Sequence, residues 1–134
     1  MNFDINLAAG LLAGVAAMIP GSVIYSPPVL GKRWMKEIGM SEKDMKAGSP
    51  GKAMVMMLVT ALVTGLAASI VVSTMGAEGV ADALKVCLLL VWFPISVNLS
   101  QVFFEKRSWA LFEISALNHI LTFLVIGIVL GLFL

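Results

Sequence analysis

Four long apolar runs, separated by short polar segments, constrain this chain more than any other feature. They cover about residues 5–26, 53–75, 80–104 and 109–134. A membrane-spanning helix needs about 20 mainly apolar residues. Inside lipid, only a helix satisfies all the backbone polar groups of a segment this long. The sequence therefore predicts an all-α integral membrane protein that crosses a bilayer four times.

The composition favours an environment of lipid rather than water. Hydrophobic residues make up 60% of the chain and charged residues 13%, roughly half of the ~25% that is usual in soluble domains. The length is sufficient for one domain, so we expect a single transmembrane domain over residues 1–134. The first run lacks the basic start of a signal peptide and is interpreted as a retained helix.

Basic residues are concentrated in two of the three connections between the runs. The connection of about residues 31–52 and the short one after residue 104 hold eight of the nine lysines and arginines, and Lys85 is the ninth. The positive-inside rule then places both connections in the cytoplasm and both termini outside. The residues expected to anchor the helix ends at the interface are Lys32, Arg33, Trp34, Lys106, Arg107 and Trp109.

The cytoplasmic connection of residues 31–52 is expected to be amphipathic and partly helical. Trp34 and Ile38 are one helical turn apart beside basic residues, which is typical of a helix in the headgroup layer. Ser41 and Asp44 resemble a capping box, so a second short helix is predicted over about residues 41–46. The connection either tethers the chain to the membrane surface or docks a partner.

The sequence also resembles itself at an offset of 74 residues. Residues 18–33 then align with residues 92–107, with six identities in sixteen positions. Because the offset spans two helices, we expect two repeated hairpins, related by an axis along the membrane normal and closed as a four-helix bundle. Pro20 and Pro94, which align, are each expected to kink a helix and free a carbonyl near the serine two residues on.

Two segments resemble one known family. They are Tyr25-Ser26-Pro27 with Gly31-Lys32 and Trp34-Met35, and Phe104-Glu105-Lys106-Arg107-Ser108-Trp109 with Leu111-Phe112 and His119. The chain resembles the domain of unknown function 1761 family over nearly its whole length, and these two segments carry the most specific part of the resemblance. The usual pattern has an aromatic residue where Ile24 stands, and often a tyrosine where Asn118 stands. The resemblance implies a small multi-pass membrane protein and assigns no catalytic residue.

Polar side chains inside the predicted helices are the candidate functional site. His119 is ten residues from Trp109, or about 15 Å at 1.5 Å per residue, near the middle of a core about 30 Å thick. Glu113 is about 6 Å deep by the same rise and is expected to reach the interface or to pair with Lys32 or Lys106. The predicted intramembrane polar cluster comprises His119, Asn98, Ser96, Ser115, Ser22, Tyr25, Ser26 and Glu113.

His119 has three possible roles. A neutral histidine bonded to Asn98 or a serine would fix helix packing, whereas a proton relay or a substrate contact would make it functional. A haem or metal ligand would need a second histidine, and the chain has one histidine and one cysteine. No cofactor and no metal are therefore expected, and Cys87 is interpreted as a buried small residue.

Glycines mark the expected helix contacts. Gly10 with Gly14, and Gly127 with Gly131, form G-x-x-x-G patterns in the outer halves of the first and last helices. Such patterns let helix backbones approach closely. These faces join helices either within one chain or between two copies of it.

Two classes of function fit these features. A transporter or channel-like subunit for a small solute or ion would use the midplane cluster, and would form a homo-oligomer because four helices rarely enclose a pore. An accessory, lipid-binding or structural module would use the basic connection, with the bilayer, an unidentified membrane partner or a small-molecule ligand as its target. An enzyme is not expected without a nucleophile–base pair or paired acids, and nucleic-acid binding is not expected without a separate basic patch.

Overall fold

The computed structural model describes residues 5–134 and is all-helical within them. Four helical rods are long and apolar enough to cross a membrane. They are Leu7–Ile24, Pro50–Thr74, Val80–Phe104 and Trp109–Leu132. Each rod lies within a few residues of a predicted run. The second begins earlier than expected, at Pro50, because a proline is well tolerated at the first position of a helix.

The first and third rods are each interrupted once. The first consists of α1 (Leu7–Ala16) and α2 (Met18–Ile24), and the third of α6 (Val80–Leu90) and α7 (Trp92–Phe104). Both interruptions lie just before a proline, which lacks the N–H that would continue the helical hydrogen-bond ladder. The sequence therefore located both breaks through Pro20 and Pro94.

The neighbouring serines do not bond to the carbonyls that these prolines leave free. Ser22 Oγ donates to the Met18 carbonyl at 2.9 Å, and Ser96 Oγ donates to the Phe93 carbonyl at 2.8 Å. The sequence predicted only that the freed carbonyls lie near Ser22 and Ser96, and both hydroxyls bond to other carbonyls. A helical serine finds its nearest acceptor three or four residues back along its own helix, and here those acceptors are different carbonyls.

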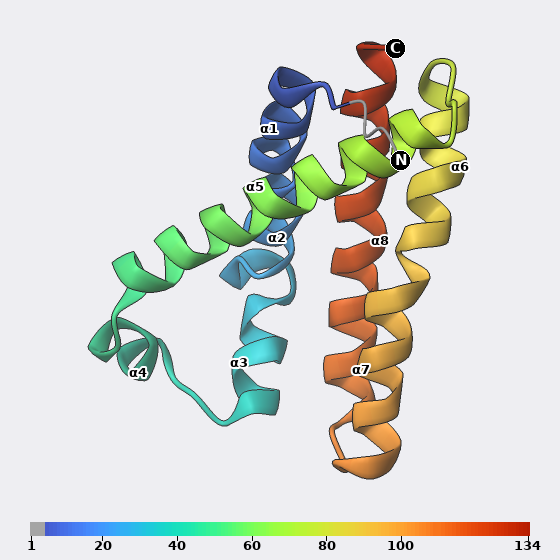
Figure 1. Cartoon of the computed structure of the whole chain (residues 1–134). Coiled ribbons are helices and arrows are strands. Elements are labelled where there is room, and N and C mark those ends of the chain that lie inside the picture. The colour runs from blue at the N-terminus through green and yellow to red at the C-terminus, as the bar shows by residue number, and fades with distance from the viewer. Residues whose placement is uncertain (1–4) are drawn as a thin grey trace.

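The rod α8 (Trp109–Leu132) lies at the centre of the arrangement. It packs against α1, α2, α3, α6 and α7, and it runs opposite to the first and third rods (Figure 1). The rod α5 (Pro50–Thr74) crosses α1 obliquely, so that residues 50–60 are exposed on every face while its second half joins the bundle. Residues 25–49 and 105–108, which form two of the connections, lie at one end, hereafter the basic end (Figure 1).

Glycines set two close helix contacts, both within the chain. A Cβ added to Gly65 of α5 would lie 2.8 Å from the Gly14 Cα atom and would collide with the Gly10 carbonyl. A Cβ added to Gly127 would lie 3.2 Å from the Leu84 Cα atom, and one added to Gly131 would collide with the backbone of Val80. The first G-x-x-x-G face therefore packs on α5, and the second packs on α6.

The buried core lies at the end opposite the basic end, where these close contacts occur. It consists mainly of alanine and small aliphatic side chains: Ala9, Ala13, Ala17, Ala68, Val72, Ala83, Val86, Cys87, Ile126 and Leu130. The thiol of Cys87 is free and fully buried, which agrees with its interpretation as a small core residue. Small side chains keep the rods close together here. Toward the basic end, α5 moves away from α8, whereas α7 stays packed against it (Figure 1).

The connection between α2 and α5 contains three short helical pieces. They are the π-helical turn η1 (Pro27–Gly31), α3 (Lys32–Ile38) and α4 (Glu42–Ala47). The predicted capping box begins α4: the Asp44 N–H donates to Ser41 Oγ at 3.2 Å, and the Ser41 N–H donates to Asp44 Oδ2 at 2.9 Å. Both short helices were expected from the sequence, whereas η1 was not.

Candidate functional site

His119 of α8 is hydrogen-bonded to Asn98 of α7. The Asn98 Nδ2 and His119 Nε2 atoms are 2.9 Å apart, and both side chains are half-buried. Because an amide nitrogen donates, Nε2 accepts, and the neutral ring carries its proton on Nδ1. This contact is the one required if His119 fixes the packing of two helices.

The remaining members of the predicted polar cluster do not join this pair in one hydrogen-bonded network. Their hydroxyl groups are used locally, since Ser22 and Ser96 bond within their own helices and Ser26 Oγ donates to the Val23 carbonyl at 2.6 Å. Ser115 is half-buried and forms no hydrogen bond within residues 5–134. Backbone carbonyls one turn back compete with distant partners for the hydroxyl of a helical serine. In this protein the hydroxyls of Ser22, Ser26 and Ser96 bond to those local carbonyls.

Tyr25 packs at the turn between α2 and α3 and does not join the polar cluster. Its ring packs edge-on against Trp34, with ring centroids 5.1 Å apart. Between them, the Gly31 N–H donates to the Ser26 carbonyl at 2.9 Å, and a side chain at Gly31 would collide with the carbonyl of Tyr25. This tight η1 turn directs α3 against α8.

Glu113 of α8 pairs with Arg33 of α3, whereas the sequence predicted that it would reach the interface or pair with Lys32 or Lys106. Arg33 Nη2 and Glu113 Oε2 are 3.7 Å apart, and the two side chains are 53% and 64% exposed. The η1 turn determines which basic residue of α3 faces α8. The sequence reveals the charges but not this direction, so the partner could not be chosen from spacing.

An open apolar groove lies between α2 and α8. Its volume is about 400 Å³, and it is lined by Ile19, Pro20, Val23, Ile24, Leu121, Leu124, Val125 and Ile128. Every lining side chain is a hydrocarbon. Sequence reasoning missed the groove, because its residues carry no polar signal and because it exists only through the way the kinked first rod meets α8.

Asn118 lies in the same contact between α2 and α8. Its Oδ1 atom is buried and accepts no hydrogen bond from residues 5–134, and it lies 3.5 Å from where a Cβ on Gly21 would be. Leu121 follows Asn118 by one turn on the same side of α8, so the amide lies beside the groove, toward the basic end. A buried amide oxygen without a donor costs about 1–3 kcal/mol.

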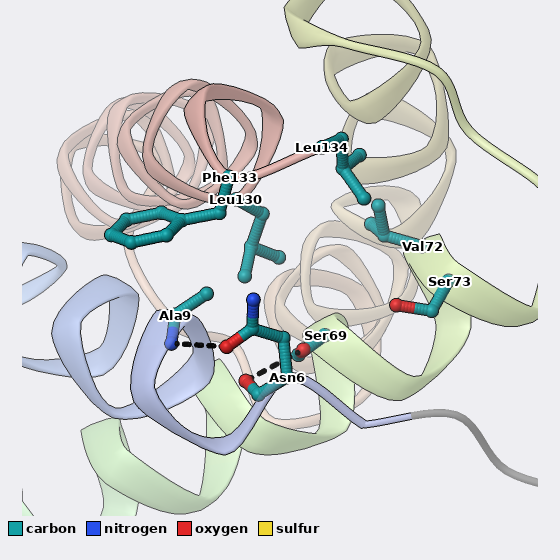
Figure 2. A pocket seen from close by; sticks show the side chains of 8 residues that line it. All are labelled: Asn6, Ala9, Ser69, Val72, Ser73, Leu130, Phe133 and Leu134. Carbon is teal, nitrogen blue, oxygen red and sulfur yellow. Dashed lines mark hydrogen bonds between the residues drawn. The ribbon is translucent and has the colours of Figure 1, made fainter.

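A small cavity at the opposite end of the molecule serves structure rather than binding (Figure 2). Asn6 caps α1 by accepting from the Ala9 N–H at 3.0 Å, and Ser69 Oγ donates to the Asn6 carbonyl at 3.3 Å. Leu130 and Phe133 of the C-terminal segment face these groups. The volume of about 10 Å³ is about that needed for one water molecule.

The turn between α7 and α8 closes the basic end. Lys106 has a left-handed backbone with φ of 53°, and Arg107 Nη1 donates to Gln101 Oε1 at 2.7 Å. Ser108 caps α8 by accepting from the Leu111 N–H at 3.1 Å. The Trp109 ring packs edge-on between Phe103 and Phe112. Within residues 5–134, no three His, Cys, Asp or Glu side chains are placed to share a metal ion.

These features define the class of protein: an all-helical chain with four rods long and apolar enough to span a membrane, one charged end and an apolar lateral groove. The chain belongs to the family described as "Protein of unknown function (DUF1761)", whose model matches residues 8–131. The resemblance at the two segments around Tyr25–Trp34 and Phe104–Trp109 is thereby confirmed, and each of these segments forms a corner at the basic end. No curated protein and no solved structure matches the chain.

Proposed function

We propose that this protein is a membrane-embedded lipid-binding module, which holds a hydrocarbon chain of one membrane lipid in the groove between α2 and α8. The wholly apolar lining of that groove carries the proposal. Its volume of about 400 Å³ lies within the range of ~300–1,000 Å³ that is usual for ligand sites. Hydrocarbon walls match a lipid chain and offer nothing to a hydrated solute.

The exposure of the groove residues supports entry from the side. Pro20 and Ile24 form a buried floor, whereas Ile19 and Val23 are 61% and 53% exposed and form a rim. Both groove helices belong to rods long and apolar enough to lie in a bilayer. A lipid chain could therefore slide into the groove laterally without passing through water.

The proposal places the basic end in the cytoplasm and both termini outside, since seven of the nine lysines and arginines lie there and Lys52 follows just beyond it, at the start of α5. This orientation is tested with single cysteines in a Cys87→Ser background. An impermeant maleimide should label Glu78→Cys, between α5 and α6, on intact cells. It should label Ser49→Cys only after permeabilisation, and the opposite pattern would reject the orientation.

We also infer that the two hairpins are repeats of one unit. The helix breaks at Ala17 and Val91 are separated by the same offset of 74 residues that aligns the two halves of the sequence. The two kinked rods run in the same direction (Figure 1). Both observations support a relating axis along the membrane normal.

Filling the groove tests the lipid-binding proposal. Leu124→Trp places a large ring in the groove, and Val63→Trp adds the same ring to an exposed position of α5 away from it. Native mass spectrometry of protein purified in mild detergent should show a lipid adduct on the wild type and on Val63→Trp, and its loss from Leu124→Trp. Matching thermal unfolding of the two variants controls for folding.

The proposal fails if the wild type carries no lipid, or if Leu124→Trp retains it at wild-type occupancy. It also fails if the groove is occupied by a second copy of the chain, which the same spectra would reveal as a dimer that only Leu124→Trp disrupts.

A transport subunit is a second candidate, and the His119–Asn98 pair favours it because it lies near the expected midplane. In that case, the protein would form a homo-oligomer, and the exposed segment of residues 50–60 offers a surface for it. Proton or solute flux into liposomes should fall in His119→Ala. Flux that is equal in the wild type and this variant would count against transport.

A further inference from the structure

We propose that the bound lipid is anionic, that Arg33 binds its phosphate group, and that Glu113 is the counter-ion which the phosphate displaces. This inference rests on the proposed lipid-binding function and names the headgroup chemistry. The ligand considered is a phospholipid of the leaflet on the side of the basic end.

Arg33 and Glu113 form a long ion pair without a close hydrogen bond between them. Its single nitrogen–oxygen distance is 3.7 Å, whereas a charge-assisted guanidinium–carboxylate hydrogen bond is about 2.7–2.9 Å long. Both side chains are more than half exposed, and such pairs are worth little in water. Arg33 makes no hydrogen bond within residues 5–134, so its five N–H donors remain available for an anion.

The surroundings of Arg33 favour a phosphate over a carboxylate of the chain. Lys32 precedes it, and Lys36 and Glu37 lie one turn further along α3 on the same side, so this short helix carries three basic residues and one acidic residue. The guanidinium fork binds a phosphate through two parallel N–H donors. A lipid phosphodiester exposes two charged oxygens, as Glu113 does, but it can approach Arg33 without being fixed to α8. The preference for an anionic lipid over a zwitterionic one comes from the neighbouring lysines, which repel a choline ammonium.

The near end of the groove lies within one leaflet's depth of this pair. Glu113 and Leu121 are eight residues apart on α8, or about 12 Å at 1.5 Å per residue. Half of a hydrocarbon core measures about 15 Å. A lipid whose phosphate lies at Arg33 would therefore bring the end of one chain to the near end of the groove, at Leu121; the rest of the groove, up to Ile128, lies deeper.

Displacement of Glu113 by the lipid phosphate and a purely structural salt bridge predict different effects of substitutions at Arg33 and Glu113. If the pair only holds α3 against α8, removing either partner weakens the protein in the same direction. If Glu113 competes with the phosphate, then its removal strengthens lipid binding while removal of Arg33 weakens it. The two substitutions should therefore have opposite effects.

The test is a titration of the purified full chain with phosphatidylglycerol and with zwitterionic phosphatidylcholine, followed by native mass spectrometry. Arg33→Gln should weaken phosphatidylglycerol binding about tenfold, the equivalent of one charge-assisted hydrogen bond. Glu113→Gln should strengthen it several-fold. Lys46→Gln, which removes one exposed positive charge on α4, should leave the binding of both lipids unchanged. Millimolar inorganic phosphate should not displace the bound lipid.

Three outcomes would overturn the inference: equal affinity of the wild type for the two lipids, weaker binding in both Arg33→Gln and Glu113→Gln, or an equal loss in Lys46→Gln. In each of these cases, the lipid-binding proposal still stands if Leu124→Trp lowers the binding of both lipids. If Leu124→Trp has no effect on either lipid, the groove proposal itself is wrong.

Discussion

A single methyl group added at Gly65 is expected to push α1 and α5 apart. The new Cβ would lie 2.5 Å from the Gly14 nitrogen and 2.8 Å from its Cα atom, and would collide with the Gly10 carbonyl. All three of these are backbone atoms, so no side chain can rotate to make room. The two helices must separate along the contact that brings α5 into the bundle.

The size of the effect follows from two opposing contributions. Overpacking a close contact costs about 1–3 kcal/mol, while replacing glycine by alanine in a helix gains up to about 1 kcal/mol. Gly51 is the matched control, because it lies in the same helix and a Cβ there would meet nothing within 4 Å. The two alanine variants should therefore differ in free energy of unfolding by about 1–3 kcal/mol.

Reversible unfolding in mixed micelles, with increasing sodium dodecyl sulfate and circular dichroism as the signal, measures this difference. Gly65→Ala should unfold earlier than the wild type, and Gly51→Ala at the same point or later. Gly65→Val should lose more than Gly65→Ala, since a larger group enters the same contact. If Gly65→Ala proves as stable as Gly51→Ala, the close approach of α1 and α5 is wrong.

Three further predictions concern single groups. Hydrogen bonds from the Ser41 backbone and then its side chain hold the pKa of Asp44 below its usual value, so the carboxylate supports α4 at neutral pH and this support is lost as the pH falls below about 4. The protection factors of the α4 amides, which are corrected for the intrinsic pH dependence of exchange, should fall there in the wild type and change less in Asp44→Asn. Lys106→Gly should raise the free energy of unfolding by about 1 kcal/mol, because glycine adopts the left-handed backbone without strain; a loss would contradict the backbone geometry. Asn118→Leu should stabilise the protein by about 1–3 kcal/mol, because it removes a buried oxygen that lacks a donor; destabilisation in the same micelle assay would mean that the amide has a partner.

Features set by local sequence could be predicted. The four rods follow from runs of apolar residues, the breaks at Ala17 and Val91 from the prolines that follow them, and the start of α4 from Ser41 and Asp44. In each case, the cause lies within a few residues of its effect. The His119–Asn98 contact was one of the partners considered because both residues fall at similar depth on neighbouring helices.

Features that depend on the relative rotation of helices could not be predicted. The sequence shows that Ser22, Ser26 and Ser96 are polar, but not that each would bond within its own helix. Depth alone allowed Lys32 or Lys106 to pair with Glu113, whereas the η1 turn brings Arg33 to it. The groove has no sequence signature at all, because a surface of ordinary aliphatic residues becomes concave only after α2 has been placed against α8.

The two segments that carry the family resemblance have a common consequence in the structure. One contains the η1 turn, in which the close approach of Gly31 to the Tyr25 carbonyl directs α3 toward α8. The other contains the turn at Lys106 and the Ser108 cap that starts α8. Together they fix Arg33 relative to Glu113, although neither residue lies at a turn itself. The residues that carry the family resemblance thus act here as corners, and the two groups proposed to meet a lipid headgroup are those that the corners bring together.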